Sequence, residues 1–180
     1  MLLEALYLML PSYFADMAPV FFSFIPWRHA PLDHGMKYKG RRILGDHKTY
    51  RGLIAELLVG VLIVWLQYGM SGISFFRDNS LLNYGNYRAG KIVVLGLLLG
   101  GGAVAGDAVK SFFKRRRRIP PGSPWLPYDH IDYTIGSLIG LLFFYVPSLG
   151  HIAIILLVGP LLHFASNYIG YLIGIRENPL

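Results

Sequence analysis

The sequence contains no cysteine and few charged residues. Without cysteine the chain can form neither a disulfide scaffold nor a thiolate metal site, and it has no cysteine nucleophile. Asp, Glu, Lys and Arg together make up 15% of the 180 residues, whereas a soluble domain usually carries about 25%. The charge that is present is gathered in short segments between long apolar runs. This pattern is typical of a polytopic membrane protein.

Five apolar segments are long enough to cross a bilayer core, which takes about 20 residues of helix. They are residues 2–25, 52–69, 90–109, 131–149 and 150–175. The last two are joined by a tight hairpin around Pro147 and Gly150. We therefore expect an all-α integral membrane protein, one domain over residues 1–180, with about five transmembrane helices and two basic cytoplasmic loops.

Basic residues are divided unevenly between the two ends of these segments. Residues 26–51 hold seven Lys or Arg and residues 110–130 hold six, but residues 70–91 hold three. With the C-terminal tail included, one side carries fourteen and the other three. The positive-inside rule then predicts a multi-pass cell-membrane protein with its N-terminus outside and its C-terminus in the cytoplasm. The net charge of +7 follows from this topology, so we expect no nucleic-acid partner.

The densest group of polar residues runs from Gly106 to Ser137. Its first half continues the third apolar segment, and Pro120–Gly122 then breaks the helix. Asp129 and Asp132 follow at the start of the fourth segment. The spacing i, i+3, i+4, i+7 places four polar residues on one helix face, namely Asp107, Lys110, Ser111 and Lys114. Three carboxylates and several cations are thus expected at one membrane interface.

Because the group offers carboxylate oxygens and the chain has no cysteine, its ligands suit Mg²⁺. Basic side chains beside such a site suit the binding of a polyphosphate. Simpler interpretations exist for each part. Asp107 could be a helix-end carboxylate paired with Lys110 or Ser111. Asp129 could be a helix N-cap with Asp132 at the third position of the helix. Residues 115–118, all arginine, could be a topology signal or a contact to anionic lipid. The functional interpretation is favoured because charge at the ends of apolar spans is costly unless it is used.

The first basic loop has a similar composition. Residues 40–52, GRRILGDHKTYRG, alternate three glycines with basic side chains. Glycine lets backbone N–H groups approach a phosphate, and the cations neutralise it. The segment lacks the GK[ST] ending of a Walker A loop. Its basic residues are Arg41, Arg42, Lys48 and Arg51.

Polar residues also occur inside the apolar segments. His163 and Asn167 are one turn apart in the fifth segment, and Asp16 lies in the first. Hydrogen bonding between helices is one explanation. Asp16 is nevertheless a functional candidate, because an ionisable group at that depth is costly. The pairs Gly96/Gly100 and Gly102/Gly106 predict close helix packing in the third segment, or space for a lipid tail.

These motifs resemble a known family. The stretch GD-xxx-S-xx-KR, the Pro-Gly loop and the D-xx-D pair at Asp129 and Asp132 are similar to the signature of CTP-dependent phosphatidate cytidylyltransferases. Nearly the whole chain is similar to their archaeal relatives, the CDP-archaeol synthases, including PLDHG at 31–35 and SNYIGYLIG at 166–174. One departure is Asp16, where an asparagine would be expected after Ala15.

The resemblance implies a Mg²⁺-dependent reaction of CTP with 2,3-bis-O-(geranylgeranyl)-sn-glycerol 1-phosphate, giving CDP-archaeol and pyrophosphate. Asp107, Asp129 and Asp132 would be the metal ligands, and with Lys110 the catalytic residues. Asp16, His163 and Asn167 are assigned to the isoprenoid glycerol ether phosphate lipid. The residues expected at CTP and its phosphates are Arg41, Arg42, Lys48, Thr49, Arg51, Ser111, Lys114 and Arg115.

Two other functions fit parts of the pattern. A phosphatidate cytidylyltransferase acting on diacyl lipid would need the same charged groups. A transporter of an anionic solute would place its site at a broken helix near the midplane, for which Pro160 and His163 are candidates. A basic scaffold for anionic lipid would need none of the three aspartates.

Overall fold

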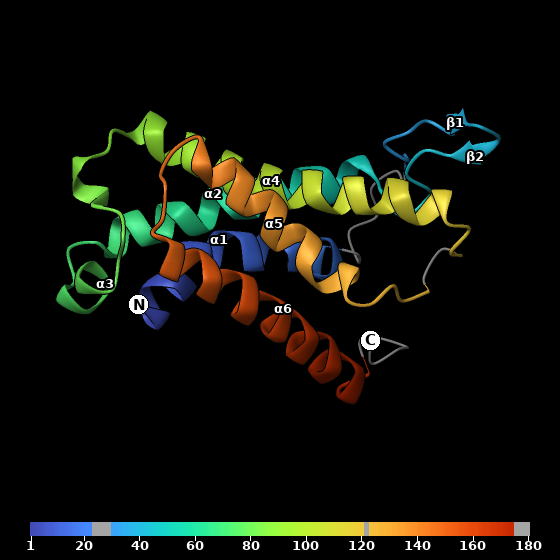
Figure 1. Ribbon diagram of the computed structural model, residues 1–180. Coiled ribbons are helices and arrows are strands. Elements are labelled where there is room, and N and C mark those ends of the chain that lie inside the picture. Colours follow the sequence, from blue (N-terminus) through green and yellow to red (C-terminus); the bar gives the residue numbers. More distant parts are fainter. Residues whose placement is uncertain (23–29, 121–122, 175–180) are drawn as a thin grey trace.

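The computed structural model describes residues 1–22, 30–120 and 123–174, and it is dominated by helices (Figure 1). Five long helices form an elongated bundle, so the all-α prediction is confirmed. A small antiparallel hairpin of β1 (Lys37–Tyr38) and β2 (Arg41–Arg42) lies at one end, and α3 (Ser74–Asp78) with the 3-10 helix η1 (Tyr84–Asn86) lies at the other. The long helices are α1 (Leu2–Phe21), α2 (Tyr50–Met70), α4 (Ala89–Arg116), α5 (Tyr128–Leu142) and α6 (Leu149–Leu172).

Three of the helices are long and apolar enough to cross a membrane, within the part of the chain that the structure describes. They are α2, α4 and α6. The 15 residues of α5 are fewer than the roughly 20 that a straight crossing takes, so the count of five spans stays a prediction. The outward surfaces of the spanning helices carry exposed leucines such as Leu62 on α2 and Leu157 on α6, as expected for helices in contact with lipid.

The helix ends differ from the predicted ranges, most of all in α4 and α5. α5 ends at Leu142, before the end of the predicted segment 131–149, because residues up to Ser148 form the connection to α6. Ser148 is the N-cap of α6, and its hydroxyl accepts a hydrogen bond from the backbone N–H of His151 at 3.4 Å. α4 runs beyond residue 109 to Arg116. The ends of the predicted segments 2–25 and 150–175, Arg28, Arg176 and residues 121–122 of the predicted helix break lie outside the described residues.

α4 is packed by glycine against α2 on one side and α5 on the other, which confirms the predicted close packing. A Cβ added to Gly100 would lie 2.8 Å from the carbonyl oxygen of Glu56 in α2. A Cβ added to Gly106 would overlap the carbonyl oxygen of Asp132 in α5. Backbones approach this closely only where side chains are absent. The glycines therefore bring the polar ends of α2, α4 and α5 together.

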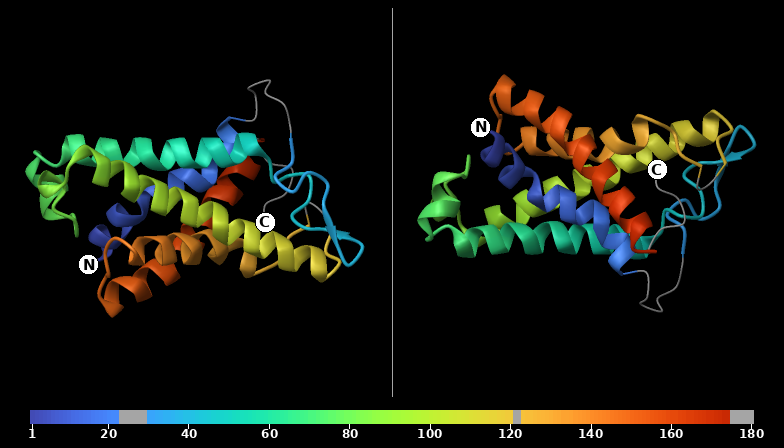
Figure 2. Two further views of the ribbon diagram at one scale, coloured as in Figure 1. Left: turned by 90° about the horizontal axis from the view of Figure 1, so that it is seen from above. Right: turned by 90° about the horizontal axis from the view of Figure 1, so that it is seen from below.

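The apolar core lies toward the end of the bundle opposite the hairpin, and Figures 1 and 2 show how the helices run between these two ends. It is formed by side chains of α1, α2, α4, α5 and α6, which include Leu8, Met9, Val64, Leu95, Leu99, Leu141 and Ile155. The N-terminal end of α1 is at this end, and the C-terminal ends of α4 and α6 point the other way. Polar side chains of the bundle are therefore gathered at the hairpin end.

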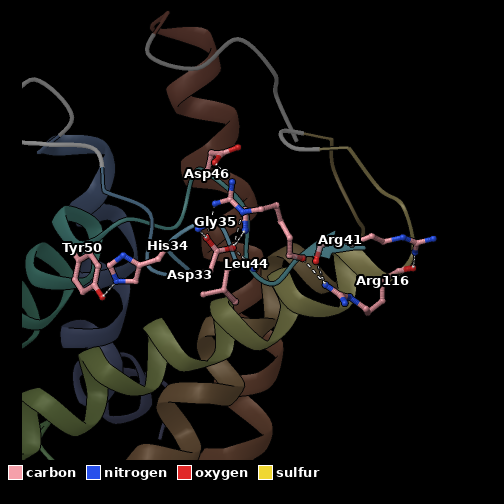
Figure 3. Close-up of polar contacts among 10 residues, drawn as sticks. Asp33, His34, Gly35, Arg41, Leu44, Asp46, Tyr50 and Arg116 are labelled. Carbon is pink, nitrogen blue, oxygen red and sulfur yellow. Dashed lines mark hydrogen bonds and ion pairs between the residues drawn. The ribbon is translucent and has the colours of Figure 1, made fainter. Parts of the chain in front are cut away.

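The β1–β2 hairpin is attached to the C-terminal end of α4 by Arg116 (Figure 3). The guanidinium of Arg116 donates to the carbonyl oxygens of Tyr38 and Arg42, each at 2.5 Å. Arg41 in turn donates to the carbonyl oxygen of Arg116 at 2.5 Å. The guanidinium of Arg116 also lies 4.7 Å from the ring centroid of Phe112, a favourable cation–π distance. The two basic loops are therefore joined to each other.

Candidate functional site

Three aspartates converge on the ammonium of Lys110 at the hairpin end of the bundle. Lys110 Nζ lies 2.9 Å from Asp107 Oδ1, 3.2 Å from Asp129 Oδ1 and 2.8 Å from Asp132 Oδ2. Asp107 and Lys110 are one turn apart on α4, and Asp129 and Asp132 are one turn apart on α5. All four side chains are at least four-fifths buried. The predicted convergence of the three carboxylates is therefore present in the structure.

Two further lysines surround this group. Lys114 Nζ lies 3.0 and 2.9 Å from the two carboxylate oxygens of Asp129. Lys48, from the first basic loop, forms an ion pair with Asp107. Loop and helix residues distant in sequence thus share one network of alternating charges. Such a network is stable only because each buried charge has a partner of opposite sign.

The suggested role of Asp129 as a simple helix N-cap is wrong. Pro127 is the N-cap residue of α5, and no side chain caps that helix. The Asp129 carboxylate instead accepts hydrogen bonds from Lys114 and from the backbone N–H of Trp125 at 2.5 Å. Asp129 therefore belongs to the charged network.

A polar cavity of about 310 Å³ opens onto these residues. Its wall includes residues from α1, α2, α4, α5 and α6 and from the first basic loop. A second cavity of about 220 Å³ lies between that loop and α4, and is lined by Gly45, Asp46, Lys48, Lys110, Ser111, Lys114 and Arg115, among others. We call this the cationic cavity. A third, of about 240 Å³, reaches Arg51, Thr49 and Glu56.

The aspartates have the donor chemistry of a Mg²⁺ site. Oxygen ligands are what Mg²⁺ prefers, and the three carboxylates already face one cation. In the described part of the chain no three His, Asp or Glu side chains are grouped closely enough to hold a metal ion by themselves. The ammonium of Lys110 contacts all three aspartates instead. The carboxylates suit a hard cation in ligand type and charge, and the structure places the ammonium of Lys110 at the centre of the three.

The residues assigned to the lipid line the same polar cavity. His163 Nε2 on α6 is 3.4 Å from Asp16 Oδ2 on α1, and His163 Nδ1 is 3.0 Å from His130 Nδ1 on α5. Asn167, one turn after His163, is buried and lines the same cavity. The structure therefore brings Asp16, His163 and Asn167 to one cavity, and their contact with the lipid stays a prediction.

Three of the residues assigned to CTP have structural partners instead of facing the aspartates. Arg41 contacts the end of α4, as described above. Arg42 donates to Asp33 at 2.6 and 3.2 Å and to Asp46 at 2.6 Å. Thr49 is the N-cap of α2, and its Oγ1 accepts from the N–H of Gly52 at 3.2 Å. A direct contact of these residues with CTP stays a prediction.

The structure adds residues that the sequence analysis did not select. Glu56 on α2 is buried and lines the polar cavity together with Asp107. Its position inside an apolar segment could have identified Glu56 as a candidate from the sequence, because ionisable residues in such segments usually have a function. His130 lies between Asp129 and Asp132 in sequence and contacts His163. Asp33, in the first loop, gave no signal beyond its place in PLDHG.

The chain is similar to known proteins over its whole length. A family model described as CarS-like, CDP-archaeol synthase, matches residues 1–180. A CDP-archaeol synthase of Thermococcus onnurineus is 37% identical over 179 residues, which are 99% of this chain and 96% of the relative. A CDP-archaeol synthase of Methanosarcina barkeri is 34% identical over 180 residues, covering 95% of this chain and 99% of the relative.

The fold is also similar to that of a solved structure. That protein is described as an intramembrane enzyme for archaeal membrane lipids biosynthesis; it matches with a TM-score of 0.73 and 31% identity over 93% of this chain and 94% of its own. The sequence matches and the structural match therefore both cover nearly the whole chain. The resemblance noted from the motifs is confirmed, and this chain belongs to the CDP-archaeol synthase family.

Proposed function

We propose that this protein transfers a cytidylyl group from CTP to the phosphate of a bis-geranylgeranyl glycerol ether lipid, forming CDP-archaeol and releasing pyrophosphate. The observation that carries the proposal is the convergence of Asp107, Asp129 and Asp132 on Lys110, at the polar end of a bundle of apolar helices. Membership of the CDP-archaeol synthase family supports the same activity.

The cationic cavity suits the triphosphate of CTP. Lys48, Lys110, Lys114 and Arg115 all line it, with Asp46 as the one carboxylate among its lining residues in the described chain. Buried cations form strong charge-assisted hydrogen bonds to phosphate oxygens. Gly45, with φ +102°, adds a backbone position at the wall where a side chain would be disfavoured. The polar cavity beside it brings the aspartates to the same phosphates.

The lipid chain fits an apolar groove on the outside of the bundle. A cavity of about 460 Å³ lies between α4 and α5, and its apolar lining includes Val109, Phe113, Ile131, Ile135 and Ile139. Lys110 and Asp132 line both this groove and the polar cavity. An isoprenoid chain in the groove would therefore carry its phosphate to the aspartates while its apolar surface stays out of water.

The reaction needs positioning and charge neutralisation more than proton transfer. A phosphate oxygen of the lipid attacks the α-phosphorus of CTP in line, the bond to the β-phosphate bridging oxygen breaks, and pyrophosphate leaves. The attacking oxygen is already anionic at neutral pH, so no general base is needed. Lys48, Lys110 and Lys114 hold the phosphates and offset their charge. Asp107, Asp129 and Asp132 would hold Mg²⁺, which supplies further neutralisation of the phosphates.

We infer the orientation in the membrane from the charge distribution. The hairpin end carries the two basic loops, joined by Arg116. We place this end, with its cavities, in the cytoplasm, where CTP is available, and the N-terminus outside. The polar cavity then opens to soluble nucleotide while the groove opens to the bilayer.

A reconstituted assay tests the activity. Purified protein in vesicles is given labelled CTP, Mg²⁺ and either the geranylgeranyl ether phosphate, a diacyl phosphatidate or no lipid. We expect pyrophosphate and a CDP-lipid with the ether substrate, and much less with the other two. Equal turnover of phosphatidate would favour the diacyl alternative. If CTP is consumed with neither lipid, the cytidylyltransferase activity is refuted, and the alternative of an anionic-solute transporter is favoured.

A further inference from the structure

Asp33 is the buried centre of the first basic loop (Figure 3). Its side chain is 1% exposed and accepts hydrogen bonds from three backbone N–H groups, those of Gly35 at 3.1 Å, Leu44 at 3.0 Å and Gly45 at 3.1 Å. Arg42 donates to both carboxylate oxygens. The acceptor capacity of one carboxylate is thus nearly filled by a single loop.

The segment around Asp33 is also tied to Lys48. The backbone N–H of Leu32 donates to the carbonyl oxygen of Lys48 at 2.7 Å, and the N–H of Lys48 donates to the carbonyl oxygen of Gly45 at 3.4 Å. Pro31 forms an isolated β-bridge with Thr49. The backbone of Lys48 is therefore fixed on one side by the chain preceding Asp33 and on the other by a turn that the Asp33 carboxylate holds.

We propose that Asp33 is a positioning residue for the triphosphate, which acts by fixing the turn at residues 42–48 so that Gly45 and Lys48 line the cationic cavity. Asp33 itself is not among the residues that line the described cavities. It acts through Lys48, whose ammonium pairs with Asp107. This inference rests on the proposed function, since it assigns the cationic cavity to CTP.

The electrostatics of the loop support a fixed arrangement. The Arg42 guanidinium, together with the backbone N–H groups of Leu44, Gly45 and Gly35, holds the pKa of Asp33 well below its usual range. Asp33 therefore stays ionised, and each of its donors keeps its acceptor. Groups oriented before the substrate arrives need no reorganisation on binding. The ammonium of Lys48 is therefore already in place at the cationic cavity when the triphosphate binds.

Asp33→Asn tests this directly, because it keeps the size of the side chain and removes its charge. An amide must direct N–H donors at Arg42 or at the backbone N–H groups, so the turn loses its anchor. We expect the KM for CTP to rise about tenfold, kcat to fall less than about threefold, and the KM for the lipid to stay unchanged. Asp78→Asn is the matched control. Its carboxylate pairs with Arg77 at 3.3 Å on an exposed surface at the other end of the bundle, and all constants should stay at their wild-type values.

A double-mutant cycle with Lys48→Ala decides whether Asp33 acts through Lys48. If it does, Asp33→Asn should change the KM for CTP less than about twofold in the Lys48→Ala background. The inference would be overturned if the double variant raised the KM for CTP by the product of the two single effects. A wild-type KM for CTP in the single variant Asp33→Asn would also overturn it. Should Asp33→Asn fail to accumulate in membranes, Arg42→Lys replaces it in the cycle, because it keeps the charge and loses the two-point contact. A wild-type protein that forms no CDP-lipid would instead refute the proposed function.

Discussion

Gly106 of α4 packs directly against the carbonyl oxygen of Asp132 in α5, without space for a side chain between them. The next residue after Gly106 is Asp107, so this contact sets the separation of two carboxylates that share the ammonium of Lys110. The site is therefore built on the close approach of two helices and not on a loop. Its geometry depends on a position that carries no chemistry of its own.

Replacing Gly106 by Ala should damage the site at a distance. The added methyl would push α4 and α5 apart, and overpacking of this kind costs about 1–3 kcal/mol. We expect turnover to fall at least tenfold and thermal stability to decrease. Gly101→Ala is the control, because its Cβ would meet Leu57 Cδ2 at an ordinary 3.5 Å. Equal activity of the two variants in the CTP assay would contradict the packing argument.

Removing the charge of any one aspartate should remove most of the activity. Asp107→Asn, Asp129→Asn and Asp132→Asn keep the side-chain shape but weaken the hold on a hard cation. Each should lower turnover by roughly two orders of magnitude, the scale of losing a main electrostatic group. Raising Mg²⁺ should restore part of the loss. If Asp129→Asn and Asp132→Asn both keep wild-type turnover at limiting Mg²⁺, the assignment of these aspartates to a metal site is wrong.

Filling the apolar groove should affect the lipid and not the nucleotide. Ile135 lines the groove between α4 and α5, and Ile135→Trp would occupy part of its volume. We expect the KM for the ether lipid to rise at least fivefold while the KM for CTP stays constant. Leu157→Trp, on the exposed surface of α6, should behave as wild type. A changed KM for CTP in Ile135→Trp would argue that the groove is not the lipid site.

Orientation can be measured by labelling single cysteines, because the natural chain has none. Lys39 lies in the turn of the β1–β2 hairpin and Ser74 begins α3, and both are exposed. In right-side-out vesicles, an impermeant thiol reagent should label Ser74→Cys and spare Lys39→Cys. Detergent should make both reactive. The reverse pattern would place the cavities outside, away from cytoplasmic CTP.

The sequence alone predicted the membrane helices and the grouping of the charged residues. The shortage of charge and the long apolar runs indicate membrane helices, because a bilayer excludes unpaired polar groups. The spacing of Asp107, Lys110 and Lys114 places them on one helix face, because an α-helix has 3.6 residues per turn. Their convergence with Asp129 and Asp132 was also predictable, since stray carboxylates at the ends of apolar helices are costly.

Only the tertiary structure decided which basic residues face the site. Arg42 and Lys48 belong to one glycine-rich loop and look equivalent in sequence, yet Arg42 is paired with Asp33 and Lys48 with Asp107. The helical period fixes neighbours on a single helix, but it does not say which loop turn folds over which helix end. That depends on contacts distant in sequence, such as Arg116 with the hairpin and Gly106 with Asp132. These contacts form only when the helices have packed, because they are set by backbone shape and by the pairing of buried charges.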